Sequence, residues 1–400
     1  MSQSVSLTQE KKRIVSLDVM RGFAILGIFL VNMLSFHSPL LYIDPLKWWK
    51  DPLDQGIYVF IDVFIQASFY PLFSMLFGYG LVILRDRAQL KEISFISIAI
   101  RRLSLLLIIG LIHAFFIWHG DILFNYALLG FIFLLFIGLS GRNMMVVGSL
   151  FYLLPNLLIM CMLLLTFLFV PGEELTMYDP LLSLQSIDIY QNGTFFEITM
   201  QRIQDWAFSN DISGLIMMFF VLLPLFLIGG GAAKFKWLER PNEYKKGLTI
   251  TFIVTSVLGL FFKLLPYLFA NNLVTLYAQD ILGGPLLAIS YGLGIAHFAE
   301  KKYFNKVLTA MSSVGKMSFS NYLFQSIVST LIFYHYGLGF YGKVSVFTGT
   351  ILVIVIYICQ IFLSRLWLKH YYYGPAEWVW RNFTYFQKQK WSRKSEEDSC

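Results

Sequence analysis

Ten apolar runs alternate with shorter polar links along this chain. About 20 apolar residues span the hydrocarbon core of a bilayer as a helix, and a helix satisfies its own backbone hydrogen bonds there. The pattern therefore predicts an all-α, polytopic integral membrane protein with about ten transmembrane helices. The runs lie near residues 16–36, 57–84, 103–118, 123–139, 145–170, 212–233, 247–269, 273–298, 314–336 and 345–368.

Charge supports this class and predicts an orientation. Charged residues make up 14% of the chain, whereas soluble domains carry about 25%. Most of the 31 basic residues fall in links on the same side as the N-terminus, and such links face the cytoplasm. Both termini are therefore expected in the cytoplasm. The net charge of +7 reflects this topology, so no nucleic-acid partner is expected.

The first apolar run carries a line of polar side chains. Arg21 and Asn32 are eleven residues apart, which places them on nearly the same helix face, roughly 16 Å apart along the axis. Asp18 and Ser35 extend this line at its two ends. Two interpretations remain open: a structural ion pair plus an interhelical hydrogen bond, or an Arg21 that holds an anionic group such as a phosphate.

A second group of polar residues is expected at the outer membrane face. His37 follows the first run, and His119 and Asp121 lie in the short link of a tight helical hairpin, residues 119–122. Asp62 lies just inside the outer end of the second run. Histidine is the commonest general base and a carboxylate its usual orienting partner, so these four residues could share a site. Their spacing does not favour a metal site.

The ninth run is unusually polar. Lys316 opens it from the cytoplasmic side, and Asn321 and Gln325 share one helix face. These two amides could bond to a neighbouring helix or line a cavity. The segment 373–381 combines a Gly-Pro break with two tryptophans and is interpreted as a helix stop with an interfacial anchor.

Several motifs in this order resemble those of the YeiB-type bacterial membrane proteins. They are LDVMRG at 17–22, HGDIL at 119–123, YALLG at 126–130, GKMSFSNYLFQS at 315–326 and GPAEWVWR at 374–381. The resemblance implies an N-terminal helical region over 1–229, a C-terminal membrane domain over 230–390 and a polar tail over 391–400. The acidic segment 171–211 of the first region is expected outside, with short interfacial helices.

The YeiB-type proteins in turn resemble a branch of the transmembrane acyltransferase superfamily. Members of that group pass an acyl group from cytoplasmic acyl-CoA to an acceptor across the membrane. One branch has a basic residue followed eleven positions later by a catalytic histidine; here those positions are Arg21 and Asn32. A branch that acts on heparan has asparagine there and its histidine slightly later, and His37 is the corresponding residue here.

This resemblance implies a set of roles. His37 or His119 is the base, oriented by Asp121 or Asp62, and Asn32 donates to the oxyanion. Asn321 and Gln325 line the substrate site. No cofactor is bound tightly; acyl-CoA is a co-substrate, and its phosphates lie among Asp18, Arg21, Arg101, Arg102 and Lys316.

The expected function is thus a membrane acyltransferase of the bacterial cytoplasmic membrane that modifies an extracytoplasmic sugar, lipid or cell-wall group. Two alternatives stay open. A small-molecule transporter would also use buried polar residues and the Gly-interrupted runs at 229–231 and 283–285, although no internal repeat is visible. A non-catalytic sensor or scaffold would have kept the fold of the superfamily after losing the catalytic histidine. Membrane lipid is the one partner common to all three.

Overall fold

The computed structural model describes residues 14–169, 178–298 and 305–393. Within these ranges the chain is helical, no β-strand forms, and a single β-bridge joins Tyr371 to Ser392. Eight helices there are long and apolar enough to cross a membrane. The prediction of an all-α, multi-pass membrane protein is confirmed.

All ten apolar runs form helices, although not all as one uninterrupted span. The helices are α1 (Val15–His37), α2 (Pro45–Trp48), α3 (Pro52–Phe64), α4 (Phe69–Leu90), α5 (Phe95–Phe116), α6 (Leu123–Phe136), α7 (Gly141–Phe169), α8 (Pro180–Asn192), α9 (Phe195–Ser209), α10 (Ile212–Lys234), α11 (Lys245–Leu268), α12 (Leu273–Ala278), α13 (Gly284–Phe298), α14 (Asn305–Lys316), α15 (Ser318–Phe333), α16 (Val346–His370) and α17 (Pro375–Tyr385). Short 3-10 turns, η2 (Leu40–Tyr42) and η3 (Pro241–Tyr244), and a π-helical turn, η4 (Gln279–Gly283), complete the chain.

In the described ranges, eight of the ten runs give long spans, two of them interrupted, and the fourth and ninth runs give shorter helices. The second run breaks between α3 and α4, where Ala67 has a left-handed backbone with φ of 54°. The eighth run contains η4, and the ninth breaks at Met317, which leaves α15 with 16 residues. Helix α6 has 14 residues, so it is also shorter than an average span.

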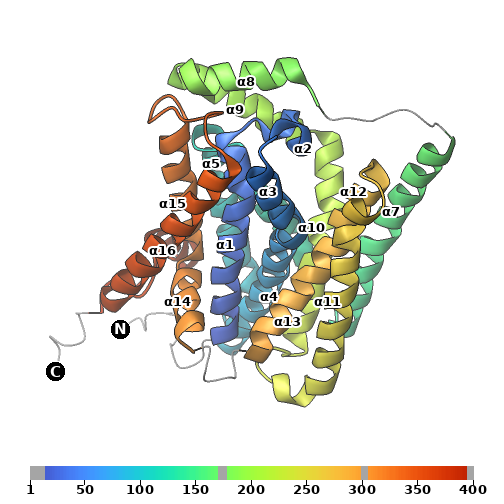
Figure 1. The fold of residues 1–400 in the computed structure, drawn as a ribbon. Helices are drawn as coiled ribbons and strands as arrows, with labels where there is room; N and C mark the ends of the chain where they lie inside the picture. Colours follow the sequence, from blue (N-terminus) through green and yellow to red (C-terminus); the bar gives the residue numbers. More distant parts are fainter. Residues whose placement is uncertain (1–13, 170–177, 299–304, 394–400) are drawn as a thin grey trace.

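Helix α1 lies in the middle of the bundle, beside α14 and α4 (Figure 1). Gly22 and Gly315 allow α1 and α14 to touch through their backbones. A Cβ at Gly22 would lie 2.0 Å from the carbonyl oxygen of Met311, and one at Gly315 would lie 1.8 Å from that of Asp18. The two glycines of the LDVMRG and GKMSFSNY segments therefore fix how closely the polar α1 approaches its neighbour.

The two ends of the bundle differ, and we name them after their polar residues. At the histidine end, where α1 finishes at His37, helix α8 lies across the bundle (Figure 1). Asp179 caps α8, and a capping box of Thr194 and Glu197 begins α9. These are the short helices expected within 171–211, of which 171–177 fall outside the described residues. The arginine end holds the start of α1 and the end of α16.

Three expectations stay predictions. The side of the membrane that each end faces is one of them. The division at 229 and 230 is another; position 229 lies within α10, and buried residues before and after it share one hydrophobic cluster. The third is the polar tail over 391–400, of which 394–400 lie outside the described residues.

Candidate functional site

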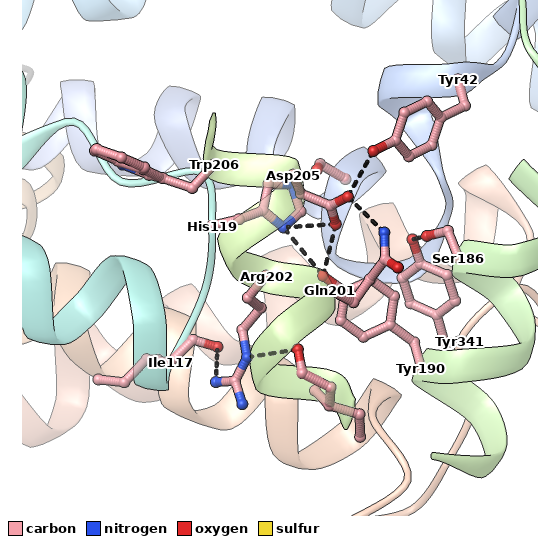
Figure 2. A network of polar contacts seen from close by, with 12 residues as sticks. Tyr42, Ile117, His119, Ser186, Tyr190, Gln201, Arg202, Asp205, Trp206 and Tyr341 are labelled. Atoms are coloured by element: carbon pink, nitrogen blue, oxygen red, sulfur yellow. Dashed lines mark hydrogen bonds and ion pairs between the residues drawn. The ribbon is translucent and has the colours of Figure 1, made fainter. Parts of the chain in front are cut away.

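A buried carboxylate, Asp205 of α9, gathers the polar groups of the histidine end. Its Oδ1 accepts hydrogen bonds from the Tyr42 hydroxyl at 2.6 Å and from the Gln201 amide at 2.8 Å. Its Oδ2 accepts one from the Tyr190 hydroxyl at 2.7 Å. Figure 2 shows these donors converging on Asp205 from η2, α8 and α9 itself. Only 1% of Asp205 is exposed, so its position is fixed by these contacts.

His119 lies between this carboxylate and α1. Its Nδ1 is 3.6 Å from Asp205 Oδ2 and 3.5 Å from the Tyr190 hydroxyl (Figure 2). Its Nε2 is 3.4 Å from the Ser35 hydroxyl, on the polar face of α1. One ring nitrogen thus faces an acid and the other faces the centre of the bundle. This is the arrangement by which a carboxylate orients an imidazole base.

Burial keeps this imidazole neutral. Burial lowers the pKa of His119 from its usual value near 6.5, and the nearby charge of Arg202 lowers it further, while Asp205 acts in the opposite direction. Because a base must begin without its proton, the lowered pKa favours the reactive form near neutral pH.

Arg202 attaches α9 to the end of α5. It is fully buried, and its guanidinium donates to the carbonyl of Ile117 at 3.2 Å (Figure 2). It also donates to the Thr199 hydroxyl at 3.0 Å. Ile117 directly precedes the segment that carries His119. Arg202 therefore sets the distance between the imidazole and Asp205, which lies one helical turn further along α9.

Asp121 forms a separate pair with His113, and the expected pairing with His119 is wrong. Its Oδ1 lies 2.9 Å from His113 Nδ1, and its Oδ2 accepts a hydrogen bond from the backbone N–H of Phe124 at 2.8 Å. The carboxylate caps the start of α6, and this role turns it toward the last turn of α5. The side chains of His113 and Asp121 are both completely buried.

His37 does not join the His119 centre either. It is 1% exposed and packs between Trp49 and Phe333, with ring centroids 6.1 and 5.9 Å away. Neither of its ring nitrogens has a hydrogen-bond partner among the described residues. Its ring lies against Gly349 of α16, where a Cβ would be 3.1 Å from Nε2.

Asp62 belongs to another polar centre, so the expected convergence of four residues is also wrong. Its Oδ2 accepts hydrogen bonds from Tyr267 at 2.7 Å and from Gln279 at 2.6 Å. Beside it, the fully buried Lys263 of α11 pairs with Asp280 of η4 at 3.1 Å. The break between α3 and α4 meets the start of α13, directly after η4, since a Cβ at Gly284 would lie 2.1 Å from the carbonyl oxygen of Ala67.

Arginines from three helices gather at the opposite end of the bundle. Arg21 of α1 lies 3.9 Å from Asp18, which is one of the two interpretations left open by the sequence. Arg102 of α5 stacks over Trp380 of α17 at 3.6 Å, and it interacts electrostatically with both Arg21 and Arg381. We call Arg21, Arg102 and Arg381 the arginine cluster.

The other residues expected near CoA phosphates have different surroundings. Arg101 donates to the carbonyl of Thr384 and lies over Phe386 at 4.5 Å, so it holds α17 in place. Lys316 ends α14 and is half-buried. Asn32 is half-buried on α1, one turn before Ser35.

Asn321 and Gln325 bond to α16, as one of the two interpretations predicted. Asn321 Nδ2 donates to the Ser364 hydroxyl at 3.1 Å, and Gln325 Nε2 donates to Gln360 Oε1 at 2.9 Å. Gln360 returns a hydrogen bond to the carbonyl of Asn321. Asn321 also lines a surface groove, and its place in a substrate site stays a prediction.

Sequence reasoning missed the central carboxylate and its donors. Asp205 is one of several acidic residues in 171–211, and nothing in the local sequence separates it from the others. His113 is not among the candidate residues that the sequence indicates. Arg381 was assigned to an interfacial anchor. The sequence did contain a signal for Arg202. An arginine within the otherwise acidic segment 171–211 indicates that it has a partner nearby.

Comparison with known proteins places the chain among related sequences. A family model described as a protein of unknown function (DUF418) matches residues 232–387. The uncharacterized protein YxaH of Bacillus subtilis is 36% identical, over 98% of this chain and 99% of its own length. The uncharacterized protein YeiB of Escherichia coli is 28% identical, over 93% and 96%. No solved structure matches the chain.

Proposed function

The chain belongs to the YeiB family of multi-pass membrane proteins, and we propose that it is an acyltransferase of the bacterial cytoplasmic membrane. The reaction moves an acyl group from cytoplasmic acyl-CoA to an extracytoplasmic sugar, lipid or cell-wall group. One observation carries the proposal: α1 bears Arg21 near one end and, near the other, Ser35 beside an imidazole oriented by Asp205.

His119 is the base of the proposed reaction. Its Nε2 takes the proton of the acceptor hydroxyl or amine as that atom attacks the thioester carbonyl. The tetrahedral intermediate then collapses, the C–S bond breaks, and the CoA thiolate leaves. Asp205 stabilises the imidazolium formed in the first step, and the proton then passes to the thiolate. The Asn32 amide, one turn from Ser35, is the proposed donor to the oxyanion.

The arginine cluster is the proposed site for the phosphates of CoA. Guanidinium groups bind phosphate with two parallel hydrogen bonds, which makes arginine the usual residue for this task. Arg21 and Ser35 are fourteen residues apart, roughly 21 Å along the helix axis. The bound acyl-CoA would therefore lie along the polar face of α1, with its thioester near His119.

Binding of acyl-CoA to the detergent-purified full chain tests the proposal. Arg21→Ala and Arg102→Ala should each weaken binding by roughly tenfold or more, since a hydrogen bond to a charged group contributes about 1.5–3 kcal/mol. Arg142→Ala, an exposed position on α7, should leave affinity unchanged. His119→Gln should retain binding and lose acyl transfer. A folded wild-type protein that binds no acyl-CoA would overturn the proposal.

A transporter is the second candidate, because of the polar centre at η4. Lys263 is buried in a membrane-spanning helix and pairs with Asp280 on a π-helical turn, and such irregular, charged spans often mark transport pathways. Solute flux into proteoliposomes without acyl-CoA, abolished by Lys263→Met, would favour this function. Flux that is the same in protein-free vesicles would exclude it.

A further inference from the structure

A groove opens on the lipid-facing side of the bundle at the arginine end. It lies between the first half of α15 and the last half of α16, and its volume is about 430 Å³, within the usual range for small-molecule sites. Phe324, Leu363 and Leu366 form its walls and are 40%, 53% and 46% exposed. A groove with such walls on a membrane protein is accessible to lipid.

The floor of this groove is polar, which is unusual for a surface that faces lipid. Asn321, Gln360 and Ser364 line it, and each is at least nine-tenths buried. Their hydrogen bonds to one another offset part of the cost of placing amides and a hydroxyl in a membrane. An occupant of this groove should therefore be apolar along its length and polar where it meets the floor.

The depth of the floor matches the ester region of a phospholipid. Ser364 lies six residues before His370, which corresponds to about 9 Å along α16. Trp367 and Tyr371 stack at 4.4 Å beside His370, and Trp391 packs against both. Such aromatic groups mark the membrane interface. If His370 is level with the headgroups, Ser364 lies about 9 Å deeper, at the inner boundary of the interfacial layer of about 5–8 Å, where the ester bonds are found.

The rim of the groove carries positive charge. His370 lines it, and the adjacent Lys369 is exposed. Arg393 is held at the same place by its backbone hydrogen bond to the carbonyl of His370. The carboxylate of Glu377 accepts hydrogen bonds from the Ser320 hydroxyl and from the backbone N–H groups of Phe319 and Ser320 at the start of α15. Lys369 and Arg393 thus place two cations beside the rim.

We propose that this groove binds one anionic glycerophospholipid. One acyl chain lies between Phe324 and Leu363, the ester oxygens meet Asn321 and Ser364, and the phosphate lies beside His370 and Lys369. This site is independent of the proposed acyl transfer, because it uses another face of the bundle and other residues.

Fluorescence quenching by brominated lipids tests the proposal, since Trp367 lines the groove. The full chain is reconstituted in phosphatidylcholine vesicles that contain a minor fraction of phosphatidylglycerol, with the bromine on either lipid. Brominated phosphatidylglycerol should quench the tryptophan fluorescence of the wild type more than its mole fraction in the vesicles predicts. Trp367→Phe should remove most of this excess quenching. Equal quenching per mole by the two lipids in the wild type would overturn the proposal.

A matched pair of variants locates the site. Leu363→Phe places a larger side chain in the groove and should abolish the excess quenching by phosphatidylglycerol. Ile358→Phe, on the same helix at a position 57% exposed and outside the groove, should keep it. The double variant Lys369→Gln, His370→Gln should reduce the preference for phosphatidylglycerol over phosphatidylcholine. If both phenylalanine variants behave alike, the lipid is bound elsewhere.

Discussion

The two ends of the bundle handle buried charge in different ways. At the histidine end, Asp205 accepts three neutral hydrogen bonds and faces the His119 imidazole. At the arginine end, the guanidinium groups of Arg102 and Arg381 lie over aromatic rings, Trp380 and Tyr373. An aromatic face orients a cation without neutralising its charge.

This difference suggests a division between chemistry and binding. At the histidine end, the proposed base and its carboxylate are both buried and have partners within the chain, which helps to hold them in place. The arginine end brings three guanidinium groups together, and guanidinium groups are well suited to bind an anionic ligand. Substitutions at the two ends should therefore affect different steps, and the following predictions test this.

The largest effect is expected at Asp205. Asp205→Asn removes the charge that stabilises an imidazolium at His119, so acyl transfer should fall by roughly 10²–10⁴-fold, the usual contribution of a general base. The affinity for acyl-CoA should not change. Single-turnover transfer from labelled acyl-CoA measures the first and equilibrium binding the second. Asp188→Asn, an exposed position on α8, is the control. An equal loss of acyl-CoA binding in Asp205→Asn would contradict the division between chemistry at the histidine end and binding at the arginine end.

The next effect concerns the contact of α1 with α14. Gly315→Ala would bring a Cβ to 1.8 Å from the carbonyl oxygen of Asp18, and overpacking of this kind costs about 1–3 kcal/mol or more. The melting temperature in detergent should fall, together with acyl-CoA affinity, because Asp18 and Arg21 share that helical turn. Gly247→Ala has open space around it and should leave both unchanged. An unaltered melting temperature for Gly315→Ala would show that the helices can separate freely.

A smaller effect depends on pH. The pKa of His119 is lowered by burial, so the folded protein binds fewer protons than the unfolded chain as pH falls below about 6.5, and stability should decrease in that direction by up to about 1.4 kcal/mol per unit of pKa difference. The rate of transfer should also stay constant until pH falls below 6.5. Melting curves and pH–rate profiles measure both. His119→Gln should reduce the dependence of stability on pH. An unchanged pH dependence would show that another group causes it.

The smallest effect is expected at Ser35. Ser35→Ala removes one hydroxyl at 3.4 Å from His119 Nε2, and a single neutral hydrogen bond contributes about 0.5–1.5 kcal/mol. Transfer should change by about threefold, with acyl-CoA affinity retained. A loss as large as that of Asp205→Asn would make Ser35 itself a participant in the reaction.

The sequence was sufficient for the helices and for the polar face of α1. The length of each apolar run alone predicts a helix there. The spacings of three and eleven residues on α1 place its polar side chains on one helix face. The contact between Asp18 and Arg21 is of this local kind. The bonding of Asn321 to α16 is not local, but the polar character of the ninth run made a bond to a neighbouring helix one of two interpretations.

The partners of the histidines could not be predicted in the same way. Asp121 is two residues from His119, yet its capping of α6 directs it to His113. Asp205 reaches His119 only because α9 folds back over the hairpin and Arg202 holds it there. Contacts of this kind depend on the path of the chain between distant segments, and residue types and spacings do not encode that path.

Asp205 comes much later in the chain than His119, and this has a consequence for how the protein assembles in the membrane. Chains emerge from the ribosome from the N-terminus, so the segment with His119 is inserted before α9 has been synthesised. The imidazole therefore lacks its carboxylate until α7 has been inserted and α9 has folded back onto the end of α5. A truncated or partly inserted chain therefore lacks the assembled pair, and formation of the pair indicates that the first five apolar runs have been inserted.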